Sequence, residues 1–199
     1  MEQALRSSTG LCSINIRFWD AEHQPPRAVL TIMHGMAEHV DRYDDFAGFL
    51  AQNGIAVAAA DMASHGKSIS ENGIRGYFGP ENGWDRLIDD ALGVHKVIKQ
   101  AYPSVPCFLL GHSMGSFLLR TYLYTYPDAV DKAVISGTGW EDPMKVRMGK
   151  LVCKLEQARI GEKNNSALVT KLMFGSYNKA FGPVTSPNAW ICSDDAVVA

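Results

Sequence analysis

The sequence predicts an α/β protein in which a mostly parallel β-sheet is flanked by helices. Short apolar segments alternate along the chain with longer segments whose apolar residues recur at helical spacing, as they do in βαβ units. The chain has 199 residues, of which 46% are hydrophobic and 20% charged, as in an ordinary globular protein. This length suffices for one sizeable core and at most two small domains.

The first half of the expected sheet comes from three strands and one helix. Residues 12–19 alternate polar and apolar side chains, which indicates a strand with one solvent-exposed face. Residues 27–33 form an apolar run typical of a buried strand. Helical spacing of apolar residues predicts a helix over residues 41–54, closed by an Asn-Gly pair, and residues 55–61 form a further short strand.

The second half repeats this alternation. An apolar helical face over residues 84–102 is followed by a strand at 107–110 and then by a helix at 114–126, which Pro127 ends. Residues 132–137 form the last expected strand. After this strand the alternation stops, and the remaining residues contain helical segments and loops without a clear buried strand.

A Gly-His-Ser-Met-Gly motif at residues 111–115 lies between an expected strand and an expected helix. The G-x-S-x-G pattern in this context predicts a sharp strand-to-helix turn that holds Ser113 in a strained backbone conformation at the C-terminal edge of the sheet. The flanking glycines leave room where side chains would collide with the neighbouring strand and helix. We therefore interpret Ser113 as a catalytic nucleophile rather than as part of a simple Gly-rich turn.

A second motif, Ile-Met-His-Gly-Met at residues 32–36, ends an earlier apolar strand. In the α/β-hydrolase fold, the oxyanion hole takes one backbone N–H from the residue after the nucleophile. It takes another from the loop after an early strand, often at a His-Gly pair. These donors would be the backbone N–H groups of Met114 and Met36, and His34 would only hydrogen-bond the loop.

From about Arg27 to Gly139 the chain resembles the monoacylglycerol lipase and lysophospholipase group of α/β-hydrolases, often filed with the S33 serine aminopeptidases. The resemblance rests on HGMAEHVDRYDDFAGFLAQNGIAVAAADMASHGKS and GHSMGS. It continues more weakly through LMFGSYNKAF and NAWICSDDAVV, which look like the cap of bacterial lysophospholipase-like members. It implies Ser113 as nucleophile and Met36 and Met114 as oxyanion donors. The implied substrate is a single-chain lipid ester, monoacylglycerol or lysophospholipid, cleaved through an acyl-enzyme.

The change of pattern after residue 137 predicts two domains, a hydrolase core over residues 1–139 and the start of a helical cap, or lid, over residues 140–199. An amphipathic helix near the start of this cap has apolar positions at Met144, Met148 and Leu151. This stripe has two interpretations: a helix that packs on the core, or a lid whose flexible methionine side chains line an acyl channel. The preceding strand ends beside the Ser113 turn, which favours the lid.

A serine nucleophile needs a general base, which in this fold is a histidine placed after the serine and after an acidic residue. All six histidines precede Ser113, namely His23, His34, His39, His65, His95 and His112. We therefore expect a C-terminally truncated enzyme that lacks the final strands and helix and is inactive as given. The alternatives are a non-catalytic acyl-ligand binding protein and a small-ester or peptide hydrolase.

Two other features have simpler interpretations. The segment DMASHGKS ends like a phosphate-binding P-loop, but Asp61 stands where the first glycine belongs, and its carboxylate would repel phosphate. We therefore treat this loop, including His65 and Ser68, as structural. His95 falls on the apolar face of its helix, so we expect a hydrogen-bonded core histidine there.

Composition excludes several other classes of protein. The net charge of −2 gives no electrostatic case for binding nucleic acid or an anionic membrane. No cluster has metal-ligand spacing, so we expect no metal or other cofactor. The N-terminus lacks the features of a signal peptide, no stretch is apolar enough to span a membrane, and the four scattered cysteines are interpreted as buried free thiols. We therefore expect a cytoplasmic protein that acts on small lipid esters and touches membrane surfaces only transiently, through the cap.

Overall fold

The computed structural model describes residues 1–69, 73–184, 186 and 189–194. The chain is divided into two compact units, Met1–Trp140 and Glu141–Ala199. Part of the weaker C-terminal resemblance, at residues 188 and 195–198, lies outside the described residues.

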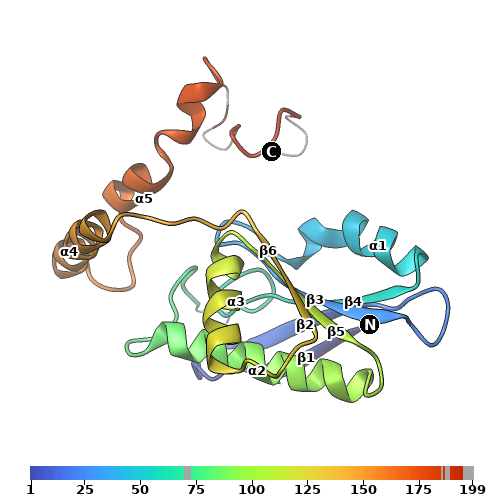
Figure 1. Cartoon of the computed structure of the whole chain (residues 1–199). Coiled ribbons are helices and arrows are strands. Elements are labelled where there is room, and N and C mark those ends of the chain that lie inside the picture. Colours follow the sequence, from blue (N-terminus) through green and yellow to red (C-terminus); the bar gives the residue numbers. More distant parts are fainter. Residues whose placement is uncertain (70–72, 185, 187–188, 195–199) are drawn as a thin grey trace. The chain divides into compact units, whose positions relative to one another are not determined.

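The first unit is built on a six-stranded sheet with the strand order β1-β2-β4-β3-β5-β6 (Figure 1). The strands are β1 (Glu2–Arg6), β2 (Ser13–Trp19), β3 (Ala28–Met33), β4 (Ile55–Ala60), β5 (Cys107–His112) and β6 (Lys132–Ser136). The strands from β3 to β6 pair in parallel, whereas β1 and β2 are antiparallel additions at one edge. The predicted α/β class is therefore confirmed, and β1 is a strand that the sequence did not predict.

Helices cover the two faces of this sheet unequally (Figure 1). A short 3₁₀ helix, η1 (Val40–Tyr43), leads into α1 (Asp44–Gln52), whose apolar side packs on one face. The helices α2 (Gly83–Ala101) and α3 (Met114–Thr125) pack on the other face, where they bury the larger core. That core includes Leu87, Ile98 and Tyr122.

The parallel pairing of β3 with β5 decides where the functional segments lie. In this register Met33, the last residue of β3, is opposite Gly111 of β5. Both strands run in the same direction, so the loop after β3 and the turn after β5 leave the sheet at the same edge. The two motifs singled out in the sequence therefore become neighbours in space.

The second unit contains α4 (Pro143–Ile160), α5 (Ala167–Phe174) and a 3₁₀ helix, η2 (Tyr177–Ala180). The carboxylate of Glu156 links the first two helices, because it accepts hydrogen bonds from Arg159 and from Ser166 Oγ at 2.5 Å. These contacts, that of Arg159 first, lower the pKa of Glu156 to about 2. Among the helices of the described residues, none combines the length and the hydropathy needed to cross a bilayer.

The four cysteines are all free thiols, but the expectation that they are buried is wrong for most of them. Only Cys107, on the central strand β5, is buried. Cys153 is exposed, because α4 turns that position toward solvent. Cys12 and Cys192 have intermediate exposure.

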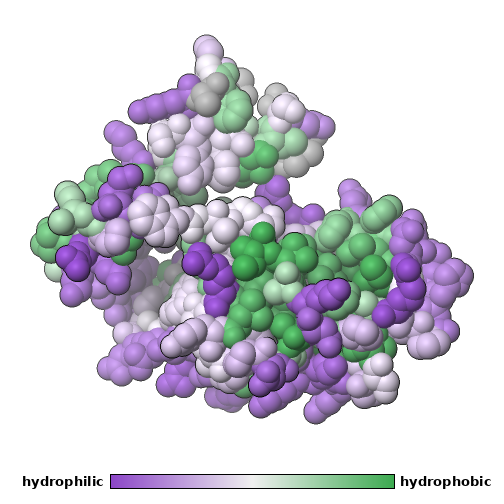
Figure 2. Space-filling model, viewed as in Figure 1, coloured by the Kyte–Doolittle hydropathy of each residue, from purple (hydrophilic) through white to green (hydrophobic). Residues whose placement is uncertain are grey.

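The strand β6 lies at the edge of the sheet and carries exposed apolar side chains. Val134 is 49% exposed and Ile135 is 44% exposed. Val134 is paired with Leu110 of β5, and both Leu110 and Phe108 are only half-buried on the face that α1 leaves partly uncovered. Figure 2 shows apolar side chains gathered over this region of the first unit.

We expect the isolated chain to self-associate and to bind a hydrophobic dye, because an uncharged apolar edge recruits other chains. Val134→Lys places a charge on this edge and should lower both self-association and dye binding. Tyr124→Lys adds the same charge at a site on α3 that is 90% exposed, and should change neither. Sedimentation velocity and dye fluorescence measure the two effects. An unmodified chain that stays monomeric at high concentration without binding dye would contradict this prediction.

Candidate active site

Ser113 forms the turn between β5 and α3 in a conformation that L-residues rarely adopt, with φ 51° and ψ −117°. Its backbone N–H donates to Ser136 O of β6 at 3.0 Å, and its carbonyl accepts from Ser116 N–H at 2.9 Å. These bonds offset the strain of the turn, and the Ser113 side chain remains half-exposed. The strained strand–helix turn that the motif predicts is therefore confirmed.

The two glycines of the motif are required by close contacts. A Cβ atom on Gly115 would lie 2.0 Å from Met33 O of the neighbouring strand. A Cβ atom on Gly111 would lie 2.4 Å from Gly115 O, in the helix. Any larger side chain would push the turn away from β3, so the expectation that the glycines make room is confirmed.

The loop after β3 lies directly beside the serine. A Cβ atom on Gly35 would be 3.2 Å from Ser113 Cβ. The next residue, Met36, is 36% exposed, and Met114 begins α3. In the part of the chain that the structure describes, neither the Met36 N–H nor the Met114 N–H donates a hydrogen bond within the protein. Both groups are thus free to bind an oxygen atom of a ligand, as an oxyanion hole requires.

His34 fixes the orientation of the peptide that carries the Met36 N–H. Its Nε2 accepts a hydrogen bond from Met62 N–H at 2.9 Å, so its Nδ1 carries the proton and donates to Gly35 O at 2.7 Å. Burial is the main cause that lowers the pKa of His34, and the ring stays neutral. In a trans peptide the carbonyl and the following N–H point in opposite directions, so the Met36 N–H points away from His34.

Glu38 closes the same loop from the other side, and no motif in the sequence singled it out. Its Oε1 accepts hydrogen bonds from Gly35 N–H and, at 2.9 Å, from the Tyr43 hydroxyl. Burial, followed by the charge of Glu38, raises the pKa of Tyr43, so the phenol remains a donor. In the sequence, the only sign of this role was that Glu38 lies between the His-Gly pair and the following helix.

The ring nitrogens of five described histidines contact other groups. These contacts are His34 as above, His39 with the Asp41 carboxylate, His65 at Met36 O, His95 near Cys107 Sγ, and His112 at Ser136 Oγ. Within the described residues, no histidine nitrogen is hydrogen-bonded to Ser113 Oγ. His95 is 6% exposed, which confirms the expected core position, and burial lowers its pKa.

The predicted lid residues belong to the second unit. Met144, Met148 and Leu151 lie along α4 and are 61%, 62% and 58% exposed. Their contact with a substrate is therefore a proposal that rests on the exposed stripe itself.

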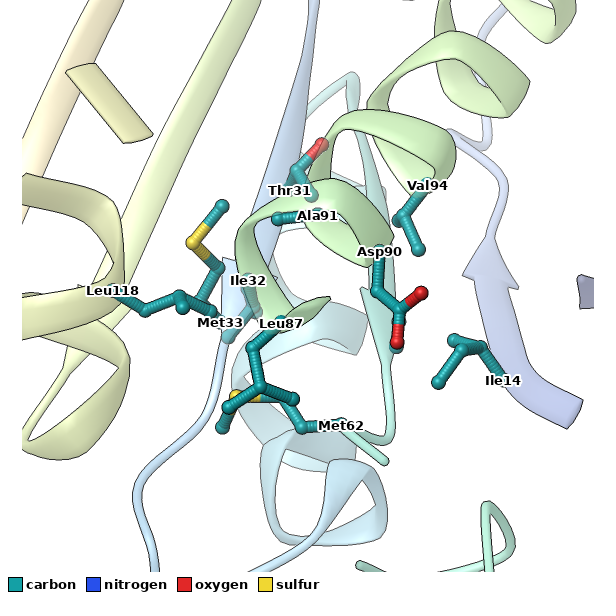
Figure 3. Close-up of a pocket in the computed structure, with 11 residues that line it drawn as sticks. Ile14, Thr31, Ile32, Met33, Met62, Leu87, Asp90, Ala91, Val94 and Leu118 are labelled. Carbon is teal, nitrogen blue, oxygen red and sulfur yellow. The ribbon is translucent and has the colours of Figure 1, made fainter. Parts of the chain in front are cut away.

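A small cavity lies in the core of the first unit (Figure 3). Its volume is about 30 Å³, and its walls are mainly apolar side chains such as Ile32, Leu87 and Leu118. Neither Ser113 nor the two proposed N–H donors line it, so it is a packing defect of the core rather than the acyl site. Among the described residues, no group of three or more His, Cys, Asp and Glu side chains is placed to hold a metal ion.

Comparison with known proteins shows which family the chain belongs to. The sequence matches the family described as serine aminopeptidase, S33, over residues 24–198. The chain belongs to this family. A monoglyceride lipase homolog from Monkeypox virus is 40% identical over 91 residues, and the monoacylglycerol lipase of Mycolicibacterium smegmatis is 30% identical over 135 residues. The resemblance to the monoacylglycerol lipase group is therefore confirmed.

Solved structures show the same fold. A thermostable carboxyl esterase from Bacillus coagulans, in complex with glycerol, aligns over 100% of this chain with a TM-score of 0.87 and 25% identity. A monoglyceride lipase from Saccharomyces cerevisiae aligns over 77% of this chain with a TM-score of 0.59 and 16% identity.

The matches cover only part of each of these relatives. They span 31% of the viral protein, 46% of the mycobacterial lipase, 63% of the Bacillus esterase and 52% of the Saccharomyces lipase. The chain thus spans less than two thirds of the length of each of these relatives.

Substitution of Gly115 by alanine tests the close approach of the serine turn to β3. The added Cβ would collide with the backbone at Met33 O, so we expect a loss of about 3 kcal/mol or more in the free energy of unfolding. Gly48→Ala is the matched control, because a Cβ at this position in α1 meets no atom within 4 Å. It should stabilise the protein by about 0.5–1 kcal/mol. Urea denaturation measures both, and equal midpoints would refute the prediction.

Proposed function

We propose that this chain provides the nucleophile and the oxyanion hole of a serine hydrolase that cleaves carboxylic esters of single-chain lipids. The observation that carries this proposal is the strained, half-exposed Ser113 turn beside the unpaired N–H groups of Met36 and Met114. Membership of the S33 family and the named monoacylglycerol lipase relatives support a monoacylglycerol or lysophospholipid as the ester.

The proposed reaction proceeds through an acyl-enzyme. Ser113 Oγ attacks the ester carbonyl carbon and loses its proton to a base, while the carbonyl oxygen gains negative charge and is held by the two N–H groups. The C–O bond to the alcohol then breaks, and the alcohol leaves with a proton. Water hydrolyses the acyl-serine and releases the fatty acid. The N–H groups act most strongly on the charged intermediate, so they lower the barrier rather than only binding substrate.

The remaining step is the transfer of the Ser113 proton to a base, for which the described residues offer no hydrogen-bonded histidine. We propose that the 199 residues alone turn over esters slowly, because no described histidine is bonded to Ser113 Oγ. Loss of the base costs on the order of 10⁶ in kcat in a dissected triad. A rate about 10³–10⁴ above that in water would remain from the oxyanion hole and substrate binding.

Covalent labelling tests the role of the serine. Incubation with p-nitrophenyl dodecanoate should place a dodecanoyl group on Ser113, detected by mass spectrometry of the digested protein, and turnover should stay near the residual level. Ser113→Ala should abolish the label, and Ser104→Ala, at an exposed serine before β5, should retain it. Binding of dodecanoate without any acylation would favour the non-catalytic acyl-binding alternative. Faster cleavage of a peptide p-nitroanilide than of the ester would favour a peptidase.

We also propose that residues 140–199 act as a cap whose α4 stripe contacts the acyl chain and, transiently, a membrane surface. The exposed apolar positions Met144, Met148 and Leu151 share this helix with several lysine and arginine residues. These basic side chains would favour a transient contact with anionic lipid headgroups. Methionine side chains adapt to flexible chains, which suits an acyl substrate.

This role of α4 predicts a preference for long acyl chains. We expect kcat/KM for dodecanoyl glycerol to exceed that for butanoyl glycerol by at least about tenfold, since each buried CH₂ contributes roughly 0.8 kcal/mol. Met148→Gln should reduce the preference by about fourfold, the equivalent of one such group. Val146→Gln changes another exposed position of the same helix and should leave it intact. Equal rates for the two chain lengths would point instead to a small-ester hydrolase.

A further inference from the structure

The loop after β4 reaches across to the proposed oxyanion donor. His65 lies in this loop, is 8% exposed, and places its Nε2 at 2.8 Å from Met36 O. The other ring nitrogen, Nδ1, lies 3.1 Å from Ala63 O, so both nitrogens face carbonyl oxygens. A neutral ring carries one proton, and we assign it to Nε2 because the contact with Met36 O is the shorter of the two. The ring is also packed edge-on against His34, with ring centres 5.2 Å apart, and stacked on Phe78 at 6.0 Å. His65 is therefore held in one orientation by contacts on both sides of its ring.

We propose that His65 is a positioning residue for the oxyanion hole, acting on the Met36 N–H through the Met36 carbonyl. This proposal rests on the proposed function. His34 holds the carbonyl of the peptide before Met36, and His65 holds the carbonyl of the peptide after it. With both flanking peptides fixed, the direction of the Met36 N–H is set before the substrate arrives. Such preorganised donors stabilise a developing oxyanion without reorganisation during the reaction.

The loop that presents His65 is itself anchored to the oxyanion loop. The buried carboxylate of Asp61 accepts from Val40 N–H and from Lys67 N–H, each at 2.9 Å. Ser68 Oγ donates to Asp61 O at 2.7 Å. A Cβ on Gly66, whose φ is +46°, would lie 2.3 Å from the Asp61 carboxyl carbon, so a larger residue would displace this anchor. The P-loop-like segment thus braces the oxyanion loop at two points, Val40 and Met36.

A purely structural histidine would affect stability alone, whereas a positioning residue also affects the order of Met36 and the rate of reaction. Three variants separate these roles. His65→Ala removes the donor. His65→Gln restores it, because the Gln amide nitrogen reaches about as far as Nε2 and also donates. His95→Gln is the matched control, since it alters another buried histidine, which contacts Cys107 Sγ at 3.8 Å.

The first measurement is the ¹⁵N order parameter of the Met36 amide in the full 199-residue chain. We expect a value of about 0.85 in the unmodified chain and in His65→Gln, and a value below about 0.6 in His65→Ala. His95→Gln should leave it unchanged even though its melting temperature falls. The second measurement is p-nitrophenyl butyrate hydrolysis, where His65→Ala should lower kcat by up to about 10² with KM unchanged, and His65→Gln should recover most of the loss.

An unchanged Met36 order parameter in His65→Ala would overturn the proposal, and so would an equal loss of kcat in His95→Gln. Mobility of Met36 without any loss of kcat would overturn the catalytic part. The order parameter does not require the serine to react. Absence of a Ser113 acyl adduct would therefore refute the proposed function and leave the bracing of Met36 to be decided by this measurement alone.

Discussion

The close approach of the serine turn to the main chain of β3 is the constraint on which the site depends. A Cβ atom at Gly115 would lie 2.0 Å from Met33 O, so the helix α3 begins in direct contact with the neighbouring strand. This contact requires the parallel β3–β5 pairing, which also brings Gly35 to the side of Ser113. Ser113 and the loop after β3 are thus brought together by the sheet itself, and the loops only adjust their final orientation.

That adjustment is made by buried polar groups, which would destabilise the fold if they lacked partners. His34 is 1% exposed and Asp61 is 2% exposed, and each is satisfied by backbone groups of the two loops at this edge. Because these partners are main-chain atoms, their geometry is coupled to the course of the loops. Moving either loop would leave a buried donor or acceptor unpaired, so the network favours a single arrangement of the oxyanion loop.

The sequence predicted the central strands and helices because their patterns are strong: β3 is an almost continuous apolar run, and α2 has apolar residues at helical spacing. It missed β1, since Glu2–Arg6 has no alternation and pairs through its backbone with β2. The proposed roles of Ser113 and of the Met36 and Met114 N–H groups came from local motifs. The contact between His65 and Met36 was not, because it joins residues 29 apart through a side chain and a carbonyl, and neither residue type nor spacing encodes it. The exposure of Cys153 was likewise mispredicted, because the scattered cysteines were expected to be buried as a class, whereas Cys153 lies nine residues after Met144, on the side of α4 opposite the apolar stripe.

Charge stabilisation and proton transfer are separate tasks in a serine hydrolase, and in this structure His34 and His65 are hydrogen-bonded to the loop after β3. A ring nitrogen that already donates to a carbonyl or accepts from an amide has no free lone pair for the serine proton. His34 has both nitrogens engaged in this way, and His65 presents its nitrogens to the carbonyls of Met36 and Ala63. A proton on His34 Nε2 would break the hydrogen bond that this atom accepts from Met62 N–H, so using His34 as the base would disturb the loop. His34 and His65 thus hold the loop beside Ser113, and among the described residues no histidine nitrogen is hydrogen-bonded to Ser113 Oγ.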